Sequence, residues 1–71
     1  MDIRKVFGER FSEEMKYGKI SYAELARRLN VTKASVSMYK HGKALPSLEV
    51  FAEICEILEV SADYLLGIKD E

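Results

Sequence analysis

Apolar residues recur every three or four positions along most of the chain, with charged residues between them. In residues 2–17 this stripe passes through Phe7, Phe11 and Met15, which is the spacing of one face of an amphipathic α-helix. Gly18 follows the stripe and is predicted to end the helix. No segment alternates apolar and polar residues over several positions, so the pattern predicts no strand.

Residues 21–42 predict two short helices joined by a tight corner. Ser21 precedes Glu24 by three positions, a capping-box pattern in which each side chain bonds the backbone amide of the other residue. Thr32 is a second N-cap candidate, and Asn30 lies at the corner, where a left-handed backbone is expected. Helices joined this closely must cross steeply, so the segment predicts a helix-turn-helix. The two predicted helices span residues 22–29 and 33–40.

The last third of the chain predicts two further helices. Ser47 is the predicted N-cap of the fourth helix, and Ser61 that of a short fifth helix over residues 62–66. Residues 68–71 are predicted to form a loose tail. The pattern therefore predicts a compact all-α fold of five helices around one core. Apolar spacing gives the fourth helix a predicted buried face of Leu48, Phe51, Ala52, Ile54, Cys55 and Leu58.

Composition narrows the class of protein. With 71 residues, of which 48% are hydrophobic, the chain is predicted to form a single globular domain over residues 1–71. No apolar run approaches the roughly 20 residues of a membrane span and no signal-peptide pattern occurs, so we expect no membrane partner. The only cysteine, Cys55, cannot form an internal disulfide, which favours a cytoplasmic protein.

Charge is divided unequally along the chain, although the net charge is only −1. Residues 1–45 carry ten Lys/Arg against five Asp/Glu, whereas residues 46–71 carry one against seven. A one-sided surface for a polyanion would produce such an asymmetry. An unevenly charged solvated surface would produce it too, so charge alone leaves both interpretations open.

No set of residues predicts catalysis or metal binding. His41 is the only histidine, and Cys55 is predicted to be buried in another helix, whereas a zinc site needs three or four ligands. Neither a Ser/His/Asp set nor a glycine-rich phosphate loop occurs, and five short helices leave little room for a substrate pocket. We therefore expect no enzyme activity, metal, cofactor or small-molecule ligand.

Several motifs along the chain recur together in one known family. They are Ser21-x-x-Glu24-Leu25-Ala26, Leu29-x-Val31-Thr32, Ser35-Val36-Ser37, Gly42-x-x-x-Pro46-Ser47 and Val60-Ser61-x-Asp63-Tyr64-Leu65-Leu66-Gly67. With these motifs the chain resembles the Cro/phage-repressor (XRE) helix-turn-helix family over nearly its whole length. The resemblance implies a lambda-repressor-like domain that binds double-stranded DNA, usually as a homodimer, in a bacterial or phage-encoded cytoplasmic protein.

The resemblance also implies which positions contact bases. They lie at the start and on the outer face of the second motif helix. Lys33 can donate to guanine O6 and N7, whereas Ser37 donates or accepts and so specifies little. Because Lys33 is the only strong hydrogen-bond donor in this set, few direct base contacts are expected, and readout of DNA shape is an alternative. The implied base-reading residues are Lys33, Ala34, Ser37 and Met38.

Phosphate contacts are implied at both ends of the motif, and two positions depart from the family pattern. Tyr22 stands where the family often has Gln, and its hydroxyl can still donate to a phosphate. Met15 and Lys40 replace a common Arg–Glu pair, so Met15 is expected in the core and Lys40 adds positive charge near the DNA side. The implied phosphate-contacting residues are Ser21, Tyr22, Thr32, Ser35, Lys40, His41 and Lys43.

These observations predict a sequence-specific transcriptional regulator, a repressor, that binds a two-fold-symmetric operator with the helix at 33–40 in the major groove. Two alternatives stay open. One is a protein-interaction module, such as an antitoxin-like adaptor, that keeps the helix-turn-helix shape. The other is a DNA binder of low specificity. Apolar residues near the end of the chain are expected to be exposed and are the candidates for a homodimer surface: Tyr64, Leu65, Leu66 and Ile68.

Overall fold

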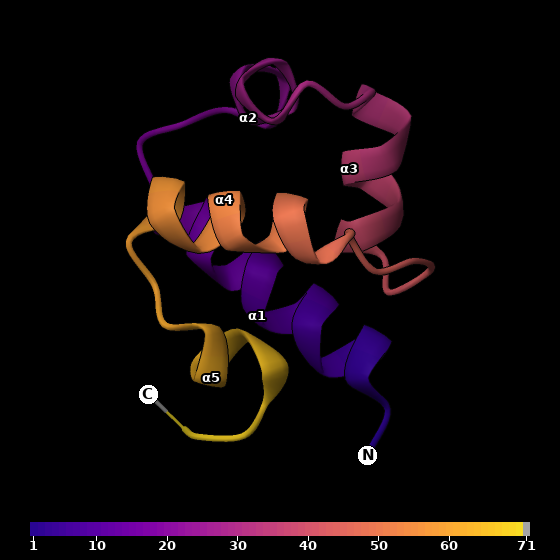
Figure 1. Ribbon diagram of the computed structural model, residues 1–71, viewed down its shortest axis with the longest axis vertical. Helices are drawn as coiled ribbons and strands as arrows, with labels where there is room; N and C mark the ends of the chain where they lie inside the picture. Colours follow the sequence, from indigo (N-terminus) through magenta and orange to yellow (C-terminus); the bar gives the residue numbers. More distant parts are fainter. Residues whose placement is uncertain (71) are drawn as a thin grey trace.

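The computed structural model describes residues 1–70, which form five helices and no strand (Figure 1). Helix α4 crosses in front of the long helix α1, with α2 and α3 above and α5 below in this view. The predicted all-α fold and the five predicted helices are confirmed. Their bounds are α1 Ile3–Tyr17, α2 Tyr22–Leu29, α3 Lys33–Lys40, α4 Leu48–Leu58 and α5 Ala62–Leu66.

Each helix from α2 to α5 begins at a hydroxyl residue. The side-chain oxygens of Ser21, Thr32, Ser47 and Ser61 each accept a hydrogen bond of 3.0–3.2 Å from the backbone amide three residues later. Each bond satisfies one of the amides that a helix leaves without an internal partner at its start. The four predicted caps are confirmed, and they fix where the helices begin.

The second half of the predicted capping box at α2 is wrong. The Glu24 carboxylate does not return to the Ser21 amide but accepts two hydrogen bonds from the guanidinium of Arg27, one of them at 3.0 Å. A bidentate contact between opposite charges is stronger than a bond to a neutral amide, and Arg27 lies one turn away on the same helix face. Glu24 and Arg27 therefore neutralise each other.

Two non-glycine residues adopt the left-handed backbone that ends a helix. Asn30 has φ 57° at the end of α2, as predicted, and its amide bonds to the carbonyl oxygens of Ala26 and Arg27. Glu59 has φ 54° at the end of α4, which sequence did not predict, because Glu is not a residue that favours this conformation. Both turns are sharp enough to send the chain directly into the next helix.

The core is built around α1. The rings of Phe7 and Phe11 are fully buried and stack with centroids 5.5 Å apart. Tyr39 and Phe51 meet the Phe7 ring edge-on at 6.4 and 5.8 Å, so α3 and α4 pack on the same aromatic centre. The buried core comprises Phe7, Phe11, Met15, Leu25, Ala26, Leu29, Val36, Tyr39, Ile54 and Leu65.

The predicted buried face of α4 is correct only in part. Ile54 is fully buried, and Phe51, Cys55 and Leu58 are partly buried against the core. Leu48, the first residue of the helix, is 86% exposed, and Ala52 is exposed as well. Periodicity places Leu48 and Ala52 on the apolar face, but burial requires another element to cover that end of the helix.

Helix α1 touches the end of α3 through backbone atoms at Gly8. A Cβ atom at this position would lie 2.9 Å from the carbonyl oxygen of Tyr39 and 3.0 Å from the amide nitrogen of Gly42. Only glycine fits so close an approach. Gly42 itself has φ 69°, which turns the chain away from α3. Among residues 1–70 no helix is both long and apolar enough to cross a membrane.

Candidate nucleic-acid interface

Helix α3 has one buried face and one exposed face. Val36 and Tyr39 point into the core, with 1% and 7% of their surface exposed. All four predicted base-reading residues lie on the opposite face and are exposed, Met38 by 45%. Their spacing along the helix brings them into two adjacent rows on this face. The face is therefore free of internal packing and consists of Lys33, Ala34, Ser37 and Met38.

A hollow of about 210 Å³ separates this face from the start of α2. Both base-reading candidates and phosphate-contacting candidates line this hollow. Two ammonium groups and the one histidine lie around it, so it suits a negatively charged group. The lining residues are Tyr22, Lys33, Val36, Ser37, Lys40 and His41. Lys43 is exposed in the loop that follows and does not line the hollow.

The hydroxyl candidates for phosphate contacts are already engaged at helix starts. The Ser21 oxygen accepts from the Glu24 amide. The Thr32 hydroxyl accepts from the Ser35 amide and donates to the Ser35 hydroxyl, both at 3.0 Å. Because Ser35 accepts this bond, its own proton remains available to an outside acceptor. Ser21 likewise only accepts, so both serines keep a hydroxyl proton that can be donated to a phosphate.

Tyr22 is held at the meeting point of three helices. Its ring meets Phe11 of α1 edge-on at 6.1 Å, and its hydroxyl lies close to the Ser12 side chain. Burial raises the pKa of the Tyr22 phenol, and the Ser12 contact opposes this shift. On its other side, the ammonium of Lys40 lies 4.8 Å from the ring centroid. The hydroxyl that the sequence assigned to a phosphate thus lies beside Ser12 of α1.

Sequence reasoning missed Ser12. Its hydroxyl donates to the Lys40 carbonyl at 3.3 Å and so ties α1 to the last turn of α3. Gly8 contacts the preceding carbonyl, of Tyr39, from one turn earlier on α1. Two small residues four positions apart lie on one face of a helix and allow another backbone to approach. That spacing is the signal in the sequence that could have located this contact.

Met15 and Lys40, two departures from the family pattern, make different contacts. Met15 is buried in the core, with 6% of its surface exposed, as predicted. Lys40 takes no carboxylate partner within residues 1–70 and lies over the Tyr22 ring instead. Neither substitution leaves an isolated buried charge, which would be costly.

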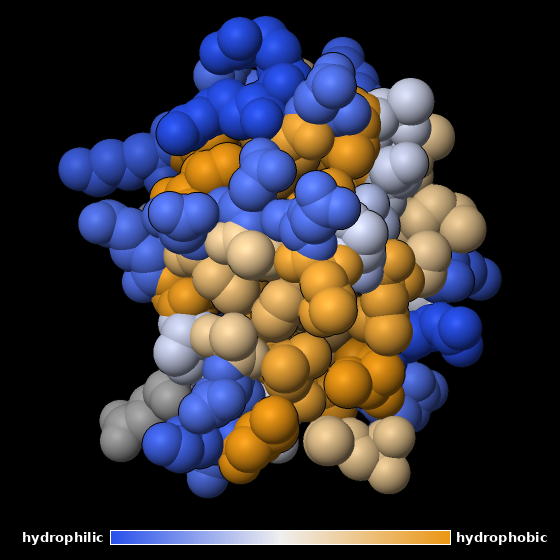
Figure 2. Space-filling view, viewed as in Figure 1, coloured by the Kyte–Doolittle hydropathy of each residue, from blue (hydrophilic) through white to orange (hydrophobic). Residues whose placement is uncertain are grey.

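The predicted homodimer candidates do not share one environment. Leu65 is fully buried, so the expectation that it is exposed is wrong: it faces inward from α5 and closes the core. Tyr64 and Leu66 are partly buried, and Ile68 is 63% exposed. Figure 2 shows apolar side chains gathered on the surface below α4 and beside α5.

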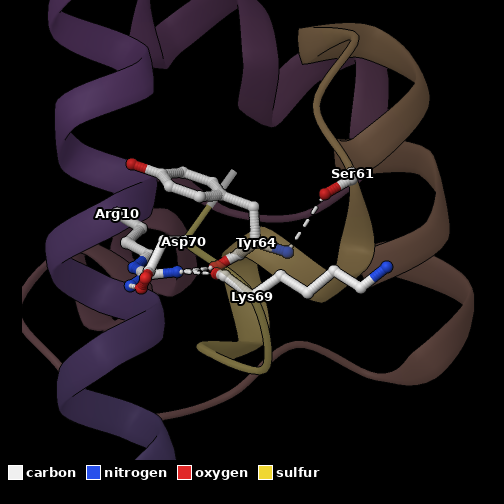
Figure 3. A network of polar contacts seen from close by, with 5 residues as sticks. All are labelled: Arg10, Ser61, Tyr64, Lys69 and Asp70. Carbon is white, nitrogen blue, oxygen red and sulfur yellow. Dashed lines mark hydrogen bonds and ion pairs between the residues drawn. The ribbon is translucent and has the colours of Figure 1, made fainter.

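Arg10 fastens the end of the chain to α1 (Figure 3). Its guanidinium lies 4.5 Å from the centroid of the Tyr64 ring and donates 2.6 Å hydrogen bonds to the carbonyl oxygens of Tyr64 and Lys69. A further nitrogen lies 3.7 Å from the Asp70 carboxylate. Lys69 and Asp70 of the predicted loose tail thus contact α1, and residue 71 lies outside the described residues.

Internal pairing removes several cations from the predicted basic surface. Arg27 pairs with Glu24, and Arg10 with Asp70. Arg28 lines a hollow with Glu53 and Glu56 of α4. Lys33, Lys40 and Lys43 remain as positive charges on the α3 side, and Lys5 of α1 lines a further hollow with Lys40 and His41, together with Asp2 and Glu9. Within residues 1–70 no three His, Cys, Asp or Glu side chains gather as metal ligands do.

Comparison with known proteins places the motif in a family. A family model described as "Helix-turn-helix" matches residues 14–65. Two regulators of Bacillus subtilis (strain 168), the uncharacterized HTH-type transcriptional regulators YobD and YqaE, are 26% and 31% identical to the chain over 66 and 61 residues. The transcriptional repressor RstR of the cryptic phage CTXphi, from Vibrio cholerae, is 30% identical over 59 residues.

The chain spans only part of these relatives. The aligned segments cover 83–93% of this chain but 53–59% of the relatives, so the similarity concerns one domain of them. No solved structure matches the chain significantly.

Proposed function

The chain belongs to the Cro/phage-repressor (XRE) family of helix-turn-helix proteins, and we propose that it is a DNA-binding transcriptional regulator that acts as a sequence-specific repressor. The observation that carries this proposal is the exposed face of α3 with Lys33, Ala34, Ser37 and Met38. A helix with such a face fits the major groove, where base edges differ in their donors and acceptors.

Backbone phosphates would flank α3 on both sides. The hollow between α2 and α3 holds Lys40 and His41 beside the base-reading face, and Ser35 has a hydroxyl proton to donate. Lys43 extends the positive charge into the following loop. Contacts of this kind set the position of the protein on the duplex and contribute most of the salt dependence of binding.

We propose that two copies bind one operator. Two-fold related copies of α3 would enter successive major grooves about 34 Å apart, so the operator would have two-fold symmetry. The partly exposed residues Tyr64 and Leu66, together with the exposed Ile68, are the proposed contact between copies. Leu65 supports this surface from the core side and is not part of it.

A DNA binder of low specificity is the second candidate. Among the four residues of the exposed α3 face, only Lys33 carries a strong hydrogen-bond donor. Ala34 and Met38 offer apolar contact, and Ser37 accepts or donates without preference. Such a face supports binding through phosphates and DNA shape as well as through bases.

Selection of random duplexes against the purified protein, at two salt concentrations, tests the proposal. We expect a two-fold-symmetric motif, and we expect Lys33→Ala to relax selection at one position in each half-site, at a cost of about 1–3 kcal/mol. Lys19→Ala is the matched control, because Lys19 is exposed in another hollow beside α4. It should leave the selected motif unchanged.

Other outcomes separate the alternatives. Salt-dependent binding without an enriched motif would replace the sequence-specific proposal by the low-specificity binder. No DNA binding at either salt concentration would overturn both and favour a protein-interaction module.

A further inference from the structure

The ammonium group of Lys40 has an unusual position at the end of α3. It lies 4.8 Å from the centroid of the Tyr22 ring, on the first residue of α2. Among the described residues it takes part in no hydrogen bond or ion pair with another side chain. A cation within about 6 Å of a ring face is attracted by the negative charge of that face. The ring is therefore what holds this charge in place.

The Tyr22 ring is itself fixed by its surroundings. Phe11 touches it edge-on at 6.1 Å, and the Ser12 side chain lies close to its hydroxyl. Both come from α1, the helix that also carries the centre of the core. The Ser12 hydroxyl in turn donates to the carbonyl of Lys40. Ser12 thus lies close to the Tyr22 hydroxyl and also donates to the backbone of Lys40, whose side chain lies over the Tyr22 ring.

Lys40 therefore presents its charge from a restrained position. A free lysine side chain loses much rotational freedom when it binds, and a side chain that is already held loses less. The three N–H groups of the ammonium remain available, because a ring face occupies none of them as a hydrogen-bond acceptor would. The same hollow is lined by Lys33 and His41, so an anion there would meet the ammonium of Lys33 as well as that of Lys40.

We propose that Tyr22 acts through its ring, as the residue that positions Lys40, and that the Lys40 ammonium is the group that binds a DNA phosphate at this place. The proposal rests on the proposed function. It replaces the expectation that the Tyr22 hydroxyl donates to the phosphate. Tyr22 is then a positioning residue, and its phenyl ring matters more than its oxygen.

The slope of log affinity against log salt concentration tests this, because each phosphate contact contributes about one to the slope. We expect Lys40→Met to lower the slope by about one. We expect Tyr22→Leu to cause a similar loss and Tyr22→Phe to keep the wild-type slope. In the Tyr22→Leu background, Lys40→Met should lower the slope no further, because the positioned contact is already absent.

Lys43→Met is the matched control in the same assay. Lys43 is exposed and carries the same charge, but no aromatic ring lies under it among the described residues. Its effect on the slope should be the same in the wild-type and Tyr22→Leu backgrounds. If Lys43→Met lowered the slope in the wild type but not in the Tyr22→Leu background, the proposal would be overturned. The Tyr22 substitution would then have a general effect on DNA binding.

A second measurement examines the contact without DNA. A methylene group beside an aromatic face is shifted upfield in a proton NMR spectrum, so the Lys40 ε-protons should be shifted in the wild type and in Tyr22→Phe. An unshifted wild-type signal would overturn the proposal even if Tyr22→Leu failed to fold.

The outcomes distinguish this inference from the proposed function. DNA binding with an unchanged slope in Tyr22→Leu, or with a slope lowered equally in Tyr22→Phe, would overturn the inference and leave the function standing. Absence of DNA binding by the wild type would overturn both, and the NMR shift would then show only an internal contact.

Discussion

Three tyrosines among the described residues lie close to a cation, and two of these contacts, at Tyr64 and Tyr22, have different consequences. Arg10 lies 4.5 Å from the centroid of Tyr64, and Lys40 lies 4.8 Å from that of Tyr22. The Arg10 guanidinium also donates to two carbonyl oxygens and lies near the Asp70 carboxylate. Among residues 1–70, the Lys40 ammonium has no such hydrogen bond or ion pair and contacts the Tyr22 ring.

The difference shows that contact with an aromatic ring does not by itself determine whether a charged side chain stabilises the fold or stays accessible at the surface. Guanidinium has five donors in a planar fork, so Arg10 can stack on Tyr64 and still fasten the chain end to α1. Ammonium is compact and keeps its donors directed outward when a ring lies beneath it. The Arg10 site therefore stabilises the fold, whereas the Lys40 site leaves a positive charge accessible at the α3 surface.

The largest expected effect comes from a change in the core next to the Tyr22 site. Phe11 is fully buried on α1, next to Arg10, and its ring touches Tyr22. Phe11→Ala should lower the free energy of unfolding by about 3–5 kcal/mol, because it deletes a buried ring and leaves a cavity. Urea denaturation followed by circular dichroism measures this. A loss below about 1 kcal/mol would show that the aromatic centre is not the basis of the fold.

An intermediate effect is expected from Arg10→Met. This change keeps much of the side-chain volume but leaves the Tyr64 and Lys69 carbonyl oxygens without their donor. The free energy of unfolding should fall by about 1–3 kcal/mol, as expected when hydrogen bonds to a charged group are lost. The salt slope of DNA binding should not change at 25 °C. A lowered slope would show that Arg10 also faces the DNA.

The smallest effect on stability is expected from Lys40→Met, the matched change at the other tyrosine. An exposed contact between a cation and a ring contributes about 0.5–1 kcal/mol, and methionine can still pack on the Tyr22 ring. The free energy of unfolding should therefore change by less than about 1 kcal/mol in the same denaturation assay. Equal destabilisation by Lys40→Met and Arg10→Met would remove the contrast between the two sites.

The helices could be predicted from sequence because their signals are local. A hydroxyl at Ser47 or Ser61 needs only the amide three residues later to mark the start of a helix. The wrong predictions concern residues whose burial depends on elements far away in the sequence. Leu48 has the spacing of a buried residue but is uncovered, and Leu65 closes the core although it was expected at the surface. Burial depends on what packs there, which periodicity does not specify.

From the sequence, the positions of the candidate site could be predicted, but not the contacts that their side chains make. Motif matching placed Lys33 and Lys40 on the α3 side, and the structure brings both to one hollow. The role of Ser12 could not be predicted in the same way, because its partner Lys40 lies 28 positions away. Likewise, a tyrosine at position 22 suggests a hydroxyl donor until the fold shows where that hydroxyl lies.

Gly8 has a consequence for how α3 is oriented. Since no carbon atom fits between position 8 and the backbone of Tyr39 and Gly42, the end of α3 lies directly against the backbone of α1. Added bulk at position 8 would tilt α3 about its outer end, and its exposed face would meet a duplex at a different angle. A residue on the inner side of the domain thus sets the direction of the exposed α3 face and, under the proposed function, would determine which base edges Lys33 reaches.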